Sequence, residues 1–164
     1  MSLKRAFQPV VDAGTRVLIL GSLPSDASLK AAQYYAHPRN AFWRLTGAVV
    51  GRDLADLAYA ERLEALRAAR VGLWDVIASA ERPGSLDSAI RNAAAADLNR
   101  LVSSLPDLRA VAFNGGTAAR VGRRSLSGAA VELVDLPSSS PAHTMAFEPK
   151  LAEWRPLSRF LITD

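Results

Sequence analysis

The amino-acid sequence predicts an α/β protein with three layers, α/β/α, around a central four-stranded, mainly parallel sheet. Apolar runs typical of strands alternate along the chain with stretches typical of helices, which is the pattern of a parallel sheet covered on both faces. The 164 residues, 49% of them hydrophobic, supply one core but leave no room for two domains of ordinary size. We therefore expect one domain over residues 1–164.

Four short runs rich in β-branched residues predict the strands. The first, RVLILG at 16–21, is apolar throughout its middle and leads straight into a loop. Similar runs occur at 71–77, 110–115 and 131–136, each followed by small or turn-forming residues. Each run is short enough for a strand that is buried on both faces.

Helices are predicted between and after these strands, at 41–50, 53–69, 97–105 and 117–124. The second has leucines at helix-compatible spacings, and Asp53 is placed to cap its first turn. A last amphipathic stretch covers 149–162. Pro156 lies inside it and is expected to disturb or kink that helix.

The composition argues against several classes of protein. There is no cysteine and only two histidines, so we expect no disulfide, no thiolate chemistry, no metal and no cofactor. No apolar run approaches the roughly 18 residues of a membrane span, and the start of the chain lacks the apolar core of a signal peptide. We expect a cytoplasmic protein with no membrane partner.

Positive charge is concentrated in the first third of the chain. The net charge is +4, and residues 1–52 carry seven Lys or Arg against two Asp. Such a balance suits binding to phosphates, although many basic proteins bind no nucleic acid.

The loops that follow the predicted strands are the places to look for a site, because ligands of open parallel sheets bind beyond the carboxyl ends of the strands. All four loops are rich in small polar residues. They are GSLPSDAS, IASAERPGSLDS, NGGTA and LPSSSPAH.

The segment 21–43 combines a polar loop with two tyrosines, a histidine, an arginine and an asparagine. An extruded nucleic-acid base needs an aromatic face, amides that address its edge, and cations for the flanking phosphates. The structural alternative is that the aromatic side chains only pack, and that Asn40 caps the helix that follows.

The motif YAHPRNAFW at 35–43 resembles the Phe-Ala-His-Pro-x-Asn-x-Phe-Trp segment of mismatch-specific uracil-DNA glycosylases. The resemblance extends to the loop after the first strand, to GLWDVIASAER, to FNGG and to LPSSSPAH. Together with GSLDSAI, these motifs are most similar to the hypoxanthine-DNA glycosylase branch of the uracil-DNA glycosylase superfamily. The resemblance implies the superfamily's fold and a base-excision repair enzyme that hydrolyses the N-glycosidic bond of deaminated bases, hypoxanthine or uracil, in DNA.

The resemblance also assigns roles in a base-binding pocket. It places Tyr35 where the family stacks an aromatic ring on the flipped base, with the backbone of Gly21 and Ser22 beside it. Mismatch-specific relatives carry a water-positioning asparagine where this chain has Leu23. We therefore expect Asn40, which the hypoxanthine branch gives an essential role, to position the attacking water as the catalytic residue.

Two further polar residues are candidates for contact with the base. Asn114 follows the third strand, and its amide is suited to a base edge, but it is equally suited to a turn. Asp75 lies where uracil-cleaving relatives place a base-binding asparagine. Its carboxylate is suited to accept a hydrogen bond from a ring N–H, or alternatively to cap a helix or strand end.

The loop LPSSSPAH is expected to hold DNA while the nucleotide is extruded. Its predicted DNA contacts, together with an arginine from the segment 21–43, are Ser138, Ser139, Ser140, His143 and Arg39. Many relatives begin this motif with a histidine or asparagine that stabilises the departing base. Here that position is Leu136 or, in another register, Ser138. Arg82 is a candidate for phosphate contact in the loop after the second strand.

The expected partner is DNA, as damaged duplex or single strand, bound by a monomer. No lysine in the predicted pocket loops is an obvious Schiff-base nucleophile, which favours base release without strand cleavage. Two alternatives stay open: a DNA-binding protein without catalysis, and a serine hydrolase that uses Ser22 or 138–140 with His143. The motifs do not distinguish among hypoxanthine, uracil and xanthine.

Overall fold

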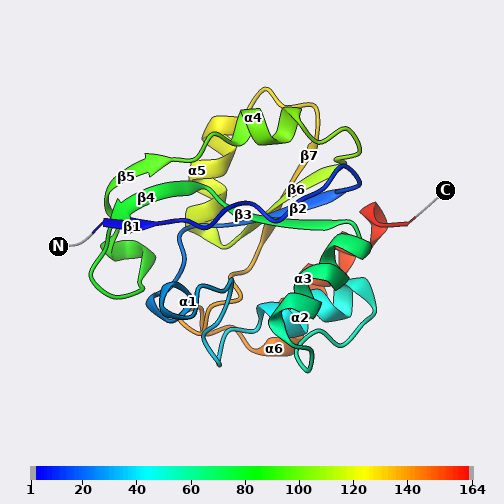
Figure 1. Cartoon of the computed structure of the whole chain (residues 1–164), viewed down its shortest axis with the longest axis horizontal. Coiled ribbons are helices and arrows are strands. Elements are labelled where there is room, and N and C mark those ends of the chain that lie inside the picture. The colour runs from blue at the N-terminus through cyan, green and yellow to red at the C-terminus, as the bar shows by residue number, and fades with distance from the viewer. Residues whose placement is uncertain (1–2, 163–164) are drawn as a thin grey trace.

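The computed structural model describes residues 3–162 and confirms the predicted central sheet. Its strands are β2 (Val17–Gly21), β3 (Val71–Asp75), β6 (Ala110–Asn114) and β7 (Glu132–Leu136). They are parallel and lie in the order β3-β2-β6-β7 (Figure 1). Gly21 pairs with Asp75, and Asn114 pairs with Leu136, so all four strands end at the same edge.

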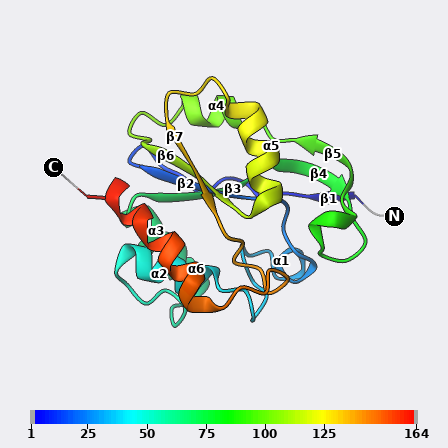
Figure 2. The ribbon, with the colours of Figure 1, turned by 180° about the vertical axis from the view of Figure 1, so that it is seen from behind.

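Alternate side chains of the central strand β2 face opposite layers, as expected for a strand buried on both sides. Val17 and Ile19 pack with the layer that contains α2 (Phe42–Val50), α3 (Tyr59–Ala68) and α6 (Phe147–Trp154). Leu18 and Leu20 pack with α4 (Leu98–Ser103) and α5 (Gly116–Leu126). Figures 1 and 2 show these two groups of helices on opposite sides of the sheet. The predicted α/β/α layering is therefore confirmed.

A second, smaller sheet was not predicted. It consists of β1 (Leu3–Arg5), β4 (Ile77–Glu81) and β5 (Arg91–Ala95) in the antiparallel order β1-β4-β5. β4 follows β3 after a single residue, so the first part of the segment predicted as a loop is a strand. The sequence RNAAA of β5 is exposed throughout and has no apolar alternation, which explains why it gave no strand signal.

One helical prediction is wrong, and one helix was not predicted. The helix expected at 53–69 begins only at Tyr59, so Asp53 is not its cap. Leu54 instead turns into the core with no exposed surface, in an irregular segment after the left-handed Gly51. The short helix α1 (Asp26–Ala31) was not predicted, and the Ser25 side chain caps it by accepting a hydrogen bond from the Ser28 N–H.

The remaining helices agree with the sequence. Asp97 caps α4 by accepting a hydrogen bond from the Arg100 N–H, and α2 and α5 lie within two residues of their predicted bounds. The last helix ends as α-helix at Trp154 and continues as the 3₁₀ helix η2 (Arg155–Phe160), the change that Pro156 predicts. Over residues 3–162, no helix has the length and apolarity needed to cross a membrane.

Candidate active site

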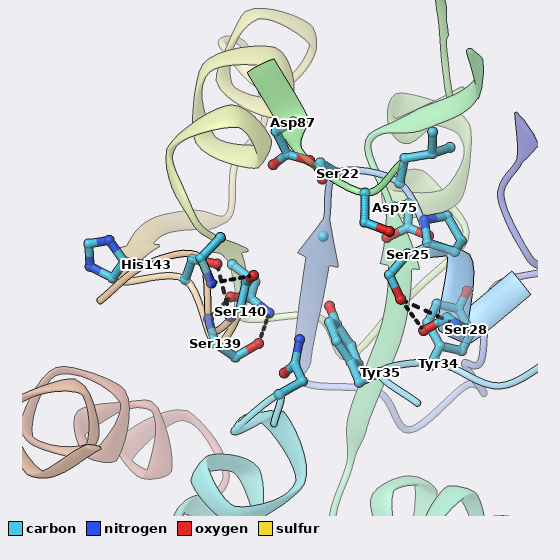
Figure 3. Close-up of a pocket in the computed structure, with 18 of the residues that line it drawn as sticks. Ser22, Ser25, Ser28, Tyr34, Tyr35, Asp75, Asp87, Ser139, Ser140 and His143 are labelled. Atoms are coloured by element: carbon cyan, nitrogen blue, oxygen red, sulfur yellow. Dashed lines mark hydrogen bonds between the residues drawn. The ribbon is translucent and has the colours of Figure 1, made fainter. Parts of the chain in front are cut away.

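A pocket of about 290 Å³ opens at the carboxyl edge of the central sheet (Figure 3). The loops after β2, β4 and β7 contribute to its wall together with the last residues of β3 and β6, as the sheet topology predicts. The structure brings all the predicted site residues to this pocket except Arg39, which is exposed and lies outside the wall. Those lining it are Gly21, Ser22, Tyr35, Asn40, Asp75, Asn114, Ser138, Ser139, Ser140 and His143.

Gly21 allows two polar side chains to reach the end of β2. A Cβ at this position would lie 2.8 Å from the Tyr35 hydroxyl oxygen and 2.8 Å from Asp75 Oδ1. Any larger residue would displace both groups, because such contacts are too short for a carbon atom. Glycine is therefore required here for close packing around the pocket.

Tyr35 is held in an unusual backbone conformation, with φ of 54°. One face of its ring stacks on Phe42 at a centroid separation of 3.9 Å and an interplanar angle of 15°. Its hydroxyl oxygen is buried and has no hydrogen-bond partner in the part of the chain that the structure describes. Burial, and next the carboxyl group of Asp75, raise the pKa of this hydroxyl, which stays protonated as a donor.

Asp75 ends β3 and is only 3% exposed. Burial, and next the negative charge of Asp87, raise the pKa of its carboxyl group to about 7, while Arg82 opposes this effect. Its Oδ2 atom has no hydrogen-bond partner among residues 3–162. The expected structural alternative, in which this carboxylate caps backbone N–H groups, therefore finds no support at Oδ2.

Asn40 has a structural role and also lines the pocket. Its Oδ1 accepts a hydrogen bond of 2.9 Å from the N–H of Phe42, the first residue of α2. The alternative of an N-cap asparagine is wrong in position, because the N-cap residue of α2 is Ala41, which forms no side-chain cap. The Asn40 Nδ2 has no hydrogen-bond partner among the described residues. The bond to Phe42 fixes the side chain while two N–H donors and one oxygen lone pair stay available.

The loop after β7 is fixed in shape by hydrogen bonds to the core. Asn114 Nδ2 donates to Ser139 Oγ, and the Ser139 N–H donates to Asn114 Oδ1, each over 2.9 Å. Lys150 Nζ donates to the carbonyl of Ser140, and burial lowers the pKa of this lysine. The serine-rich loop is therefore a preformed wall of the pocket.

Comparison with known proteins identifies the family. The model of the uracil DNA glycosylase superfamily matches residues 8–158, which is nearly the whole chain. The chain belongs to the uracil DNA glycosylase superfamily.

Two relatives of this chain are both named hypoxanthine DNA glycosylase. A protein of Methanosarcina acetivorans named hypoxanthine DNA glycosylase is 42% identical over 157 residues, which cover 96% of this chain and 99% of the relative. A second, from Methanosarcina barkeri, is 46% identical over 112 residues, which cover 68% of this chain and 71% of the relative.

A solved structure has the same fold as this chain. It is a solution NMR structure from Methanosarcina acetivorans, described as a uracil DNA glycosylase. It superposes with a TM-score of 0.88 at 42% identity, and covers 98% of this chain and 99% of its own.

The two positions considered for the start of the LPSSSPAH motif lie in different surroundings. Leu136 ends β7 and is buried in the core, whereas Ser138 lines the pocket. The apolar Leu23 lines the pocket from the other side and is 7% exposed.

The expectation that Arg82 contacts phosphate is wrong. Its side chain is buried, and it donates to the carbonyl oxygens of Pro24 at 2.6 Å and Gly84 at 2.8 Å. The Arg82 side chain therefore joins the loop after β2 to the loop after β4. Its charge is therefore used inside the fold, where burial lowers its pKa and Asp26 opposes that effect.

Sequence reasoning missed the part of the pocket formed by Ser25 and Ser28. The Ser28 hydroxyl is buried and accepts a hydrogen bond from the Ala36 N–H, which fixes the chain next to Tyr35. Within residues 3–162, no group of three His, Asp or Glu side chains is arranged as a candidate metal site.

Proposed function

We propose that the protein is a monofunctional DNA glycosylase that hydrolyses the N-glycosidic bond of deaminated bases, with hypoxanthine as the main substrate and uracil as a second one. Membership of the superfamily and two relatives named hypoxanthine DNA glycosylase support this function. The observation that carries it is the pocket, in which Tyr35, Asn40 and Asp75 meet and two buried polar atoms have no partner among the described residues.

The base enters the pocket after extrusion from the DNA stack. One face of Tyr35 is covered by Phe42, so the other face is the one available for stacking on the base. The Asp75 carboxylate accepts a hydrogen bond from a ring N–H, a group that hypoxanthine and uracil share and that the Watson–Crick edge of adenine lacks. A buried carboxylate opposite a ring nitrogen lone pair would be repelled, which favours hypoxanthine over adenine and uracil over cytosine.

Asn40 positions the water that attacks the sugar. Its Oδ1 is fixed by Phe42, so its remaining lone pair and its Nδ2 donors have a defined direction. The water oxygen bonds to the anomeric carbon while the bond from that carbon to the base nitrogen breaks. The base leaves with the bonding electrons and takes a proton, and the water loses one to solvent, which leaves an abasic site.

No covalent intermediate with the protein is needed, and no lysine lies among the described residues of the pocket wall. The strand therefore stays intact after base release. The monomer binds the DNA backbone through Ser138 and Ser140 of the loop after β7, His143 at its end, and Arg39 at the exposed surface. Ser139, also expected to contact DNA, is buried and instead fixes the loop through its two hydrogen bonds with Asn114.

A serine hydrolase has less support from the geometry. The Ser22 hydroxyl donates to Asp87 over 2.7 Å rather than to a histidine. Ser138 and Ser140 accept hydrogen bonds from backbone N–H groups of their own loop, and His143 is exposed. Among the described residues, no serine hydroxyl forms a hydrogen bond with the His143 side chain.

The test is a set of oligonucleotides that each carry one hypoxanthine, uracil or xanthine, in single and double strands, with undamaged DNA as the control. We expect alkali-labile sites at hypoxanthine, and no strand break before alkali. DNA binding without alkali-labile sites at any lesion would favour the non-catalytic alternative.

A further inference from the structure

Two serines of the pocket wall are hydrogen-bonded to each other. Ser25 is the N-cap residue of α1, and Ser28 lies in the first turn of that helix. The Ser25 hydroxyl donates to Ser28 Oγ over 3.1 Å. Both residues line the pocket, and Figure 3 shows them on the same side of it as Asp75. Ser28 is only 2% exposed, so its hydroxyl depends on partners inside the protein or in the pocket.

Each of the two serine oxygens also accepts a hydrogen bond from the backbone. The Ser28 N–H donates to Ser25 Oγ over 3.1 Å, which caps α1. The Ala36 N–H donates to Ser28 Oγ over 3.0 Å, which fixes the chain beside Tyr35. Both side chains are therefore held in place before a ligand binds.

The hydrogen-bonding capacity that remains at Ser28 is that of a donor. A serine hydroxyl has two lone pairs and one hydrogen. Ser28 Oγ accepts from Ser25 and from Ala36, so both of its lone pairs are occupied. Among residues 3–162, none accepts the Ser28 hydroxyl hydrogen. A buried donor without an acceptor is costly unless a ligand or water completes it, and Ser28 lines the pocket.

Deamination exchanges donor and acceptor on the edge of a base. Adenine and cytosine present a ring nitrogen lone pair next to an amino group, whereas hypoxanthine and uracil present a ring N–H next to a carbonyl oxygen. A carboxylate acceptor combined with a hydroxyl donor matches the second arrangement and opposes the first. Asp75 and Ser28 offer this combination from one side of the pocket.

We propose that Ser28 determines specificity by donating a hydrogen bond to the carbonyl oxygen next to the ring N–H that Asp75 binds; this inference rests on the proposed function. The carbonyl oxygen is O6 of hypoxanthine, or O4 or O2 of uracil. Ser25 sets the direction of the bond, because its hydroxyl occupies the lone pair with which Ser28 would accept from an amino group. Guanine and thymine also carry a ring N–H beside a carbonyl, so Ser28 separates deaminated bases from their amino parents and not from these two.

The test replaces the carbonyl oxygen of the lesion by sulfur, which is a weaker hydrogen-bond acceptor. Single-turnover excision is measured for hypoxanthine and for 6-thiohypoxanthine in the same duplex, and the ratio of the two rates is compared between proteins. Ser28→Ala should lower hypoxanthine excision about 3- to 10-fold, the range for loss of one neutral hydrogen bond. The thio base should lose less, so the ratio of hypoxanthine to thio base falls. The intrinsic reactivity of the thio base cancels, because only the change in this ratio is used.

Ser25→Asp is a second variant that keeps the backbone hydrogen bonds of the loop. An N-cap aspartate accepts from the Ser28 N–H as the serine does. Its carboxylate can only accept, so it also takes the Ser28 hydroxyl hydrogen and leaves none for the base. The ratio should therefore fall as it does in Ser28→Ala, although Ser28 Oγ still accepts from the Ala36 N–H.

Ser85→Ala is the matched control. Ser85 lines the same pocket, and its hydroxyl accepts a hydrogen bond of 2.9 Å from the Asp26 N–H. This variant removes a bond that fixes the loops of the pocket, and it should leave the ratio at the parental value. Thermal unfolding of each variant checks the fold, and if Ser28→Ala does not fold, the ratio in Ser25→Asp decides.

An unchanged ratio would overturn the role of Ser28, whether excision stays at the parental rate or falls equally on both bases. It would leave the two serines with a structural role only. A ratio that falls by the same factor in Ser85→Ala would overturn the role as well, because the change would then follow from a loosened loop. If the parent protein releases no base from any lesion, the proposed function fails instead.

Discussion

Asn114 at the end of β6 and Ser139 in the loop after β7 are joined by two hydrogen bonds of 2.9 Å, one in each direction. Both residues are buried, and both line the pocket. Both ends of the Asn114 amide are therefore engaged in fixing the loop, while each end keeps one further hydrogen-bonding capacity for a base. The pair connects the shape of the loop after β7 directly to the central sheet.

The change Asn114→Ala should destabilise the fold by about 1–3 kcal/mol, because it leaves the buried Ser139 N–H without a partner. Excision should fall as well. A double-mutant cycle with Ser139→Ala, measured by urea unfolding and by excision, separates the two roles. If Asn114 acts only through the loop, Asn114→Ala and Ser139→Ala should each lose excision in the same proportion to the stability that they lose. A loss of excision in Asn114→Ala beyond that proportion would indicate a separate contact with the base.

The change Asn40→Ala should lower single-turnover excision on the order of 100-fold through loss of the water-positioning amide. Since Asn40 Oδ1 also accepts from the Phe42 N–H, the loss of this hydrogen bond will cost about 1 kcal/mol of stability. Asn40→Asp keeps an oxygen acceptor for Phe42 and is the control for this bond. Full activity in a folded Asn40→Ala variant would remove Asn40 from the mechanism.

Ionisation of Asp75 should control excision near neutral pH. Its pKa is raised to about 7, and the proposed contact needs the carboxylate, so kcat/KM should rise as the pH increases through 7. In Asp75→Asn this rise should be absent. A rise of the same size in the variant would assign it to another group. The charged or titratable groups that act on Asp75 or face it are Asp87, Arg82, Tyr34 and Tyr35.

The raised pKa of Asp75 also predicts how the free energy of unfolding depends on pH. The folded carboxyl group has a raised pKa and holds its proton between its ordinary pKa of 3.8 and about 7, where the unfolded chain has released it. The contribution of this carboxyl group to the free energy of unfolding is therefore fully present below pH 3.8. It is lost as the pH rises to about 7, at no more than about 1.4 kcal/mol per pH unit. Urea unfolding of the parent and Asp75→Asn across this range checks the sign.

The sequence predicted those elements whose physical signal is local. The strand 17–21 is apolar at every buried position, and the Asp97 cap lies next to its helix. The antiparallel sheet gave no such signal, because β5 is exposed and β4 is defined by its pairing with β1 and β5, which lie apart from it in the chain. Arg82 was misassigned for a related reason: an arginine that donates to distant carbonyls has the same sequence signature as one that binds phosphate.

Most of the candidate residues could be assigned to one pocket from the sequence, since the loops after parallel strands converge at one edge wherever the helices begin. The sequence did not predict how polar groups are paired. That Asn114 bonds Ser139, whereas Asp75 Oδ2 has no partner among the described residues, depends on contacts between residues far apart in the chain. These pairings decide which side chains are available to a ligand.

The last prediction concerns Leu23, where relatives with the mismatch-specific pattern carry a water-positioning asparagine. The leucine lines the pocket at 7% exposure, and its carbonyl accepts a hydrogen bond from Arg82 that a side-chain change leaves intact. Leu23→Asn should therefore add a second amide near the attacking water and raise uracil excision relative to hypoxanthine. The buried amide will cost about 1–3 kcal/mol of stability if water does not satisfy it.

The measurement is the ratio of uracil to hypoxanthine excision on matched duplexes, with thermal unfolding as the check on folding. Leu23→Met keeps an apolar side chain of similar size and should leave the ratio at the parental value. Because both variants alter the same position in the same loop, a change confined to Leu23→Asn assigns the effect to the amide. An unchanged ratio in a folded Leu23→Asn protein would mean that position 23 does not face the reacting sugar, and would leave Asn40 as the sole candidate for positioning water.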